Sequence, residues 1–176
     1  MVNHATLNRK QVAAWCLFDF ANSSYSAVIA AVVFQVYFIN KIVGNGDGQG
    51  DLWWGRAISA SMLIVSITSP FVGGLADHAG LRKRLLAVYT ATCIAAVAGF
   101  TLLEPGAFLP GFFLIVAANL GMEGGLVFYN SFLPQIAPPQ FQGRVSGWGF
   151  GVGYAGSILS LLIALPLAKA GRFDAI

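Results

Sequence analysis

Three stretches of this chain contain no Asp, Glu, Lys or Arg, and each is long enough to cross a membrane as a helix. A bilayer core needs about 20 consecutive apolar residues in helical form. Two further stretches are as long but contain one acidic residue each, Asp19 and Glu123. The sequence therefore predicts five membrane-spanning helices. In chain order they cover approximately residues 12–39, 57–76, 85–103, 107–132 and 145–168.

The composition supports a membrane protein. The chain is 57% hydrophobic and 10% charged, whereas soluble domains are about half apolar and about a quarter charged. Helices that are apolar on every side would leave a soluble protein without a solvated surface. Spans of a β-barrel would alternate apolar and polar residues over about ten positions, and these stretches do not. The predicted class is an all-α, multi-pass membrane protein.

Neither the start of the chain nor its cysteines and histidines predict another class. Residues 1–11 are polar and the apolar stretch that follows is longer than the core of a signal peptide, so we expect it to remain as a membrane helix. Cys16 and Cys93 fall inside predicted spans, which favours packing roles over a disulfide or a metal site. His4 and His78 are far apart in the sequence. We therefore expect no metal and no cofactor.

Basic residues in the connections predict the orientation, because Lys and Arg are retained on the cytoplasmic side. With the N-terminus inside, the inner set is Arg9, Lys10, Arg82, Lys83, Arg84 and Arg144, and the outer set is Lys41, Arg56, Lys169 and Arg172. We expect a cytoplasmic N-terminus, in the plasma (inner) membrane if the source is bacterial. The net charge of +3 is then a topology signal and does not indicate nucleic-acid binding.

The connections themselves carry turn residues. Residues 44–50 are rich in glycine and predict a flexible outer loop, and residues 104–106 predict a tight turn that makes the third and fourth spans neighbours. Pro134, Pro138 and Pro139 predict an inner loop of about a dozen residues before Arg144. The chain stops after the fifth span without a closing tail, from which we expect a piece of a longer polypeptide.

Polar residues form a stripe on the first span. Asp19, Asn22, Ser23 and Ser26 recur at helical spacing and so share one face. An acid within hydrocarbon is costly unless it faces protein, water or a counter-charge, and it marks a functional site by default. We expect Asp19 to bind a proton or to contact substrate. The alternative is that Asp19 caps a neighbouring helix or forms a hydrogen bond with it.

A second, sparser stripe lies on the fourth span and comprises Asn119, Glu123 and Asn130. At 1.5 Å per residue, Asp19 lies ~10 Å and Glu123 ~13 Å from the inner ends of their spans, so the two acids could share a cavity. No Lys or Arg lies inside a span to neutralise the two acids. A proton can neutralise an acid in their place, so the proton is a candidate coupling ion. The alternative is that Glu123 reaches Arg144 at the inner surface.

Glycines define two lines along the fifth span. Gly143, Gly147 and Gly151 recur at a spacing of four, and Gly149, Gly153 and Gly156 continue to Ser160 in a second line. Small residues allow close helix approach in lipid. Because the lines point to different sides, we expect two close neighbours, of which one could be absent from this chain.

The connection after the second span contains Gly73, Asp77, Gly80, Arg82 and Lys83. Gly80 permits a positive φ, Asp77 can cap the backbone that follows, and the cations would lie at the anionic inner leaflet. This pattern resembles the signature between the second and third helices of the major facilitator superfamily. His78 departs from it, since that position more often holds Arg or Lys. The alternative is that this basic loop only sets the topology of the chain in the membrane.

Two further segments narrow the resemblance. Residues 15–23 at the start of the first span, and residues 128–134 leading to 143–149, are similar to the vacuole-effluxer-like branch of that superfamily. The resemblance implies the first five of twelve helices, which form the N-terminal half of the fold without its sixth helix. It also implies that the basic turn is a cytoplasmic gate and that the fifth helix packs between the halves. Fungal members are linked to amino-acid efflux from the vacuole.

These observations predict secondary-active transport, by alternating access, of a small polar solute such as an amino acid. The expected partners are lipids, the solute, protons, and either the missing C-terminal half or a second copy. We expect no enzyme activity, since an intramembrane hydrolase needs paired aspartates, or Ser and His, at matching depth. A polytopic scaffold or lipid-handling protein is the competing class.

Overall fold

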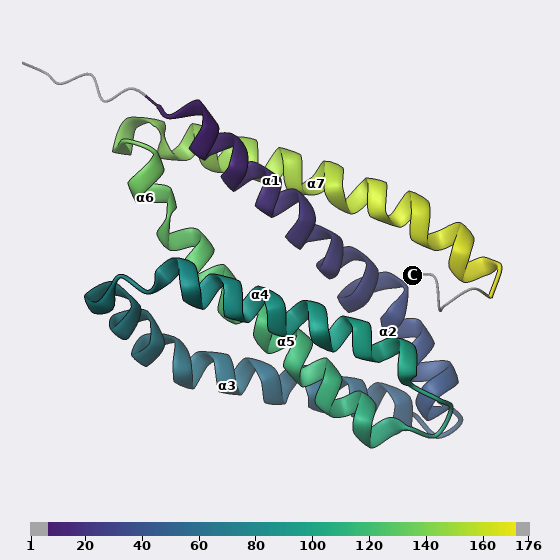
Figure 1. Cartoon of the computed structure of the whole chain (residues 1–176). Helices are drawn as coiled ribbons and strands as arrows, with labels where there is room; N and C mark the ends of the chain where they lie inside the picture. The colour runs from purple at the N-terminus through teal and green to yellow at the C-terminus, as the bar shows by residue number, and fades with distance from the viewer. Residues whose placement is uncertain (1–6, 172–176) are drawn as a thin grey trace, which may run out of the picture.

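The computed structural model describes residues 7–171, without the side chains of residues 75–79. In its described part it has five helices long and apolar enough to cross a membrane (Figure 1), which confirms the predicted all-α polytopic class. The elements are α1 (Arg9–Tyr25), η1 (Ser26–Val32), α2 (Phe34–Tyr37), η2 (Phe38–Val43), α3 (Gln49–Ala79), α4 (Arg82–Gly99), η3 (Phe100–Leu102), α5 (Phe108–Ser131), α6 (Leu133–Ile136) and α7 (Pro139–Lys169).

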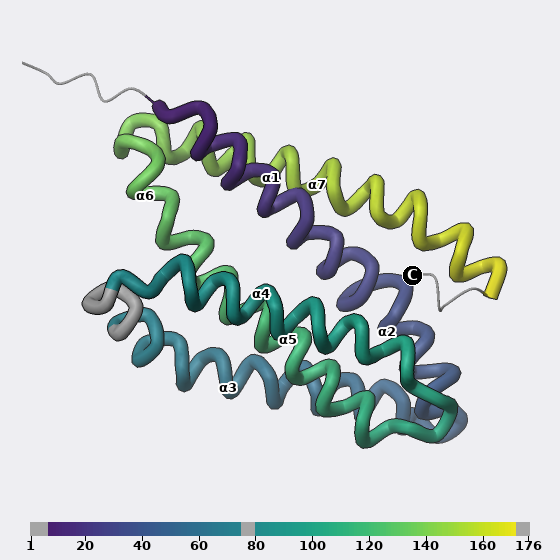
Figure 2. Tube along the Cα trace, viewed as in Figure 1, coloured from purple at the N-terminus to yellow at the C-terminus, as the bar shows by residue number. Residues whose placement is uncertain are grey.

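The helices form two groups, and the helix axes of both groups are roughly aligned. α5 packs between α3 and α4, while α1 and α7 pack along each other, and Figure 2 shows this pair beside the other three. We call the end of the bundle that holds the start of α1 and the α3–α4 turn the Arg82 end. The opposite end, with the loop between η2 and α3, is the Gly46 end.

The first span contacts both groups, since α1 packs on α7 and η2 packs on α3. The segments η1 and η2 are π-helical, and the Val33 amide donates to the Val28 carbonyl five residues back at 3.0 Å. A π-turn leaves carbonyl groups without their usual partners, and hydrocarbon offers none. Gln35, with its amide nitrogen turned toward the helix, donates to the carbonyls of Ala30 at 2.9 Å and Ala31 at 3.3 Å.

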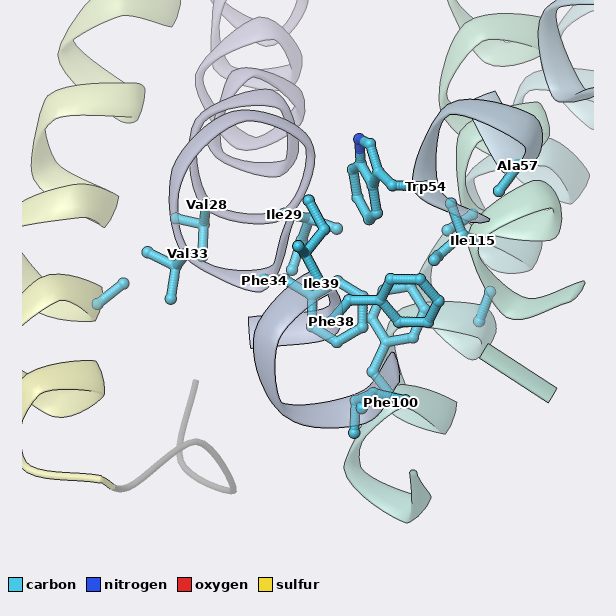
Figure 3. Packing of buried hydrophobic residues seen from close by; sticks show 14 residues of the cluster. Val28, Ile29, Val33, Phe34, Phe38, Ile39, Trp54, Ala57, Phe100 and Ile115 are labelled. Carbon is cyan, nitrogen blue, oxygen red and sulfur yellow. The ribbon is translucent and has the colours of Figure 1, made fainter. Parts of the chain in front are cut away.

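A cluster of buried apolar residues at the Gly46 end joins the first span to α3, η3 and α5 (Figure 3). The Phe34 ring stacks on Phe100 with centroids 3.9 Å apart. Phe38 is fully buried, and it lies so close to Gly111 on α5 that a Cβ there would be 2.5 Å from its ring. This cluster fixes α2 and η2 against the three-helix group.

The turns use glycine where the backbone requires it. Gly80 between α3 and α4 has φ of 63°, and Gly106 between α4 and α5 has φ of 90°. The Gly106 amide also donates to the Ile42 carbonyl at 2.8 Å, which ties this turn to the first span. The expected proximity of the third and fourth spans is confirmed, since α4 packs along α5.

Helix ends differ from the expected span ends for two physical reasons. α3 begins at Gln49 rather than near residue 57, because the helix continues through Asp51 and Arg56, charged residues that a search for charge-free stretches leaves out. α7 begins at Pro139, so the expected inner loop up to Arg144 is wrong. Pro139 starts the helix because its fixed φ suits the first helical position, where no amide donor is needed.

Candidate functional site

The polar face of α1 meets α7 at its small residues. A Cβ built on Gly153 would lie 2.7 Å from both the Asp19 Oδ2 and the Ser23 Oγ atoms. One turn further along α7, the Ser157 hydroxyl donates to the Ser23 carbonyl at 3.0 Å. The glycine therefore leaves room for a carboxylate and a hydroxyl between two membrane spans.

Ser24 extends this polar contact along the same two helices. Its hydroxyl donates to the Phe20 carbonyl of its own helix at 3.3 Å and reaches the Gly156 carbonyl of α7 at 3.5 Å. Gly156 in turn lies so close to the Phe20 carbonyl that no side chain fits between them. Close backbone approach and hydroxyl hydrogen bonds are the usual means of helix association in lipid.

A groove of about 460 Å³ lies beside this contact, between α1, η1, α4, α5 and α7. Of the predicted pathway residues, Asn22 lines it, whereas Asp19 and Glu123 do not. Its surface is mostly apolar. The lining residues are Phe18, Ala21, Asn22, Ser24, Tyr25, Val28, Ile29, Thr90, Cys93, Ile94, Val97, Gly121, Met122, Gly125, Ser160, Ile163, Ala164 and Leu167.

The predicted residues of α5 are dispersed. Asn119 is buried and donates to the Ser61 hydroxyl of α3 at 2.8 Å, while Ser61 donates to the Ile58 carbonyl at 2.8 Å. Glu123 is half-buried and Asn130 is exposed near the Arg82 end. The structure thus brings Asp19 and Ser23 together, but places Asn119 at a helix contact and Asn130 on the surface.

Replacing Asn119 with leucine should loosen the contact between α3 and α5. The change removes the amide donor to Ser61, and interhelical hydrogen bonds in membrane proteins contribute about 0.6–1.7 kcal/mol. We expect the free energy of unfolding in mixed micelles to fall by about that amount. Asn40→Leu is the control, because Asn40 is exposed and donates within its own span, to the Val36 carbonyl. An equal loss in both variants would contradict the proposed role of the Asn119 contact.

An aromatic clamp joins three spans near the Arg82 end. The rings of Trp15 on α1 and Tyr129 on α5 stack with centroids 4.5 Å apart and an angle of 8° between their planes. Trp15 Nε1 donates to the Tyr129 carbonyl at 3.2 Å, and the Tyr129 hydroxyl donates to the Trp15 carbonyl at 3.2 Å. Gly149 of α7 lies directly against the indole. These three residues, the aromatic clamp, form one contact that joins α1 to both α5 and α7.

The residues of the predicted gate loop lie at the Arg82 end, apart from the groove. Arg82 begins α4, and its Nη1 atom donates to the Ser131 carbonyl at the end of α5 at 3.5 Å. Lys83 is exposed, and a side chain on Gly73 would meet open space. The Asp77 side chain lies outside the described residues.

The two glycine lines of α7 face different surroundings. Gly149, Gly153 and Gly156 are buried against Trp15, Asp19 and Phe20 of α1. A Cβ added to Gly143, Gly147 or Gly151 would meet nothing within 4 Å. The first line therefore accounts for the α1–α7 contact, and the second line presents an open surface.

Sequence reasoning missed several residues that the structure assigns clear contacts. Ser61 and Gln35 lie within apolar stretches, and a polar side chain in such a stretch is a signal that could have found both. Tyr129 belongs to the segment that carries the family resemblance, but nothing in its spacing predicts a reciprocal pair with Trp15. That pair joins residues 114 positions apart.

Comparison with known proteins finds an MFS-type transporter and multidrug resistance proteins among the similar sequences. Over 169 residues the chain is 28% identical to an uncharacterized MFS-type transporter, YxiO, of Bacillus subtilis (strain 168), with 95% of this chain and 40% of that protein covered. It is 28% identical over 160 residues to the multidrug resistance protein MdtG of Escherichia coli (strain 55989 / EAEC), covering 91% of this chain and 36% of that protein. The MdtG protein of Salmonella choleraesuis (strain SC-B67) is 30% identical over 135 residues, 77% of this chain and 31% of its own length.

The chain thus spans about two fifths or less of the length of these relatives. No solved structure matches it. Residues 56–172 match the family described as "Vacuole effluxer Atg22 like", which is most of the chain and includes the gate loop, the α5 stripe and both glycine lines. The five spans and these matches agree on one assignment: the chain belongs to the Atg22-like vacuole effluxer family of the major facilitator superfamily.

Proposed function

We propose that the chain forms part of a secondary-active transporter that moves a small polar solute by alternating access, in the direction of efflux. The observation that carries this proposal is the position of Asp19 and Ser23 against Gly153, within two membrane spans. Membrane proteins retain an acid at such depth where it binds an ion or a substrate. Transporters of this kind place these sites near the middle of the bilayer.

An amino acid is the best candidate solute. A zwitterion needs both a carboxylate or other acceptor and hydroxyl or amide donors, and Asp19, Asn22, Ser23 and Ser26 offer this combination along one stretch of the first span. Asn119, Glu123 and Asn130 would complete the pathway from α5. The multidrug names of the MdtG relatives suggest larger, more apolar solutes, and a direct flux measurement distinguishes the two.

The remaining assignments concern topology and partners. With the N-terminus in the cytoplasm, the Arg82 end faces inward, and Gly73, Asp77, Gly80, Arg82 and Lys83 act as the cytoplasmic gate. The membrane is the plasma (inner) membrane if the source is bacterial. The second half of the transporter would come from the part that the relatives have and this chain lacks. That half, or a second copy of the chain, would pack on the open line of Gly143, Gly147 and Gly151.

The Asp19→Asn variant tests the proposed function. The variant is made in the full reading frame, reconstituted in proteoliposomes and assayed with a radiolabelled amino-acid mixture under an imposed pH gradient. Transport should fall at least about a hundredfold, a typical size for losing a positioned acid–base group. The change keeps the side chain's shape but removes its charge. Ser26→Ala on the same span removes one neutral donor, and it should lower the flux by less than Asp19→Asn does.

Two results would contradict the proposal. Full flux with an unchanged dependence on pH in the Asp19→Asn protein would eliminate Asp19 as the coupling residue. An absence of amino-acid flux in the unmodified protein, with intact insertion, would favour the multidrug class if a lipophilic dye is expelled. It would favour the competing class, a non-transporting scaffold or lipid-handling protein, if no solute moves.

A further inference from the structure

The carboxylate of Asp19 lacks a hydrogen-bond donor in this structure. Its Oδ2 atom lies against Gly153 of α7, which has no side chain, and no residue that the structure describes donates a hydrogen bond to it. Ser157, one turn further along α7, donates its hydroxyl to the Ser23 carbonyl instead. Hydrocarbon offers no donor to a carboxylate. A donor on a neighbouring helix would therefore decide how readily Asp19 ionises.

The Tyr129 hydroxyl of α5 reaches the turn of α1 that precedes Asp19. It donates to the Trp15 carbonyl at 3.2 Å, and in an α-helix that carbonyl also accepts the amide four residues later, which is the amide of Asp19. Helical side chains lean toward the N-terminus of their helix, so each one covers the turn before it. The Asp19 side chain therefore extends over the turn that the Tyr129 hydroxyl contacts, and the two groups interact electrostatically.

The Tyr129 ring is fixed, whereas its hydroxyl proton can rotate. Tyr129 is buried, and its ring stacks on Trp15 with centroids 4.5 Å apart and on Phe18 with centroids 5.1 Å apart. Its bond to the Trp15 carbonyl is 3.2 Å long, longer than the distance of about 2.7–2.8 Å that hydroxyl donors usually adopt. A hydroxyl held by one long bond can exchange its acceptor for a charged one, which forms a stronger hydrogen bond.

The other groups that face Asp19 are weak competitors for this role. The Cys16 thiol, on the same helix, interacts with Asp19 electrostatically, but a thiol is a poor hydrogen-bond donor. The facing residues of α7, Gly153 and Ser157, carry no charge. The closest basic residue along α1, Lys10, is nine positions earlier, about 14 Å along a helix. Tyr129 is therefore the strong donor placed beside Asp19 in the described part of α5.

We propose that Tyr129 is a positioning residue for the proton site at Asp19, and that its hydroxyl exchanges the Trp15 carbonyl for the carboxylate when Asp19 ionises. When a proton from water neutralises Asp19, the hydroxyl returns to the carbonyl. Each exchange breaks or restores one hydrogen bond of the aromatic clamp between α1 and α5, so the proton state of Asp19 acts on the packing of two spans. This inference rests on the proposed function of Asp19, but its test observes the carboxyl group directly and does not depend on transport.

Infrared spectroscopy of the protein in its full reading frame, in lipid vesicles, tests the inference. The carboxyl band of protonated Asp19 is the band that the Asp19→Asn variant lacks, and its intensity is followed against pH. Tyr129→Phe keeps the ring and removes the donor. The pH at which half of Asp19 is ionised should rise by about one unit in this variant, because a hydrogen bond to a charged group is about twice as strong as a neutral one. In the unmodified protein the tyrosine ring bands should shift over the same pH range as Asp19 titrates.

Trp15→Phe is the matched control. It loses the other hydrogen bond of the clamp, the indole donor to the Tyr129 carbonyl, but keeps the Tyr129 hydroxyl, so the titration of Asp19 should stay unchanged. Equal shifts in Trp15→Phe and Tyr129→Phe would assign the effect to a loosened clamp and overturn the inference. An unchanged titration in Tyr129→Phe, or tyrosine bands that do not respond to Asp19, would overturn it and leave the proposed function standing. An Asp19 band that does not titrate would overturn both this inference and the proton role of Asp19.

Discussion

Replacing Gly156 with alanine should separate α1 from α7 and lower the free energy of unfolding by about 1–3 kcal/mol or more, the range for overpacking a tight contact. The added methyl group would collide with the backbone of Phe20, which cannot rotate away as a side chain could. The Ser24 and Ser157 hydrogen bonds between these helices would lengthen at the same time. Unfolding of the chain in mixed micelles by sodium dodecyl sulfate, followed by circular dichroism, measures the loss.

Gly147→Ala is the matched control. Gly147 lies in the same helix, but a Cβ there meets nothing within 4 Å. Alanine at an open helical position should be neutral or stabilise the helix by up to about 1 kcal/mol. If both alanine variants destabilise the chain equally, the effect arises from α7 itself and the inferred contact with α1 is wrong.

Replacing Trp15 with alanine should lower the free energy of unfolding still further, by about 3–5 kcal/mol, as is typical of large aromatic side chains in a packed interior. The variant loses the stack on Tyr129 and the contact with Gly149, and leaves the Tyr129 carbonyl without its indole donor. The first span then loses a main attachment to α5 and α7 at the Arg82 end. The same unfolding assay measures the effect.

Trp148→Ala provides the comparison, because Trp148 is 50% exposed on α7. Its loss should change the free energy of unfolding by less than about 0.5 kcal/mol, as for most surface substitutions. The loss of free energy of unfolding in Tyr129→Phe should lie between those of Trp15→Ala and Trp148→Ala. This variant keeps the stack but removes the hydroxyl donor to the Trp15 carbonyl. A similar loss for Trp15→Ala and Trp148→Ala would rule out the clamp as a specific contact.

The five spans could be predicted because the absence of charge over about 20 residues is a strong requirement of the bilayer. The ends of the helices could not be predicted in this way, because a helix can continue into the membrane–water interface, where charged residues are tolerated. Arg56 illustrates this, since it lies within α3 with its guanidinium 5.5 Å from the centre of the Trp53 ring. The π-helical segments of the first span were also unpredictable, because hydropathy carries no information about backbone register.

The candidate site could be predicted in part. Helical spacing places Asp19 and Ser23 on one face, and the structure finds both against Gly153. The same reasoning cannot tell whether a polar face meets a cavity or another helix. Asn119 shows the difference, because its partner is Ser61, 58 residues earlier in the chain. Spacing in one helix does not encode which distant residue comes to lie opposite.

The pairing of α1 with α7 has a consequence for synthesis of the protein. Ser23 receives its hydrogen bond from Ser157, 134 residues later, and ribosomes add about 5–20 residues per second. The acidic face of the first span therefore remains uncovered for roughly 7–27 s while the intervening helices are made. During this interval Asp19 has no α7 beside it. We expect the nascent first span to be held at the insertion machinery until the fifth span arrives to receive it.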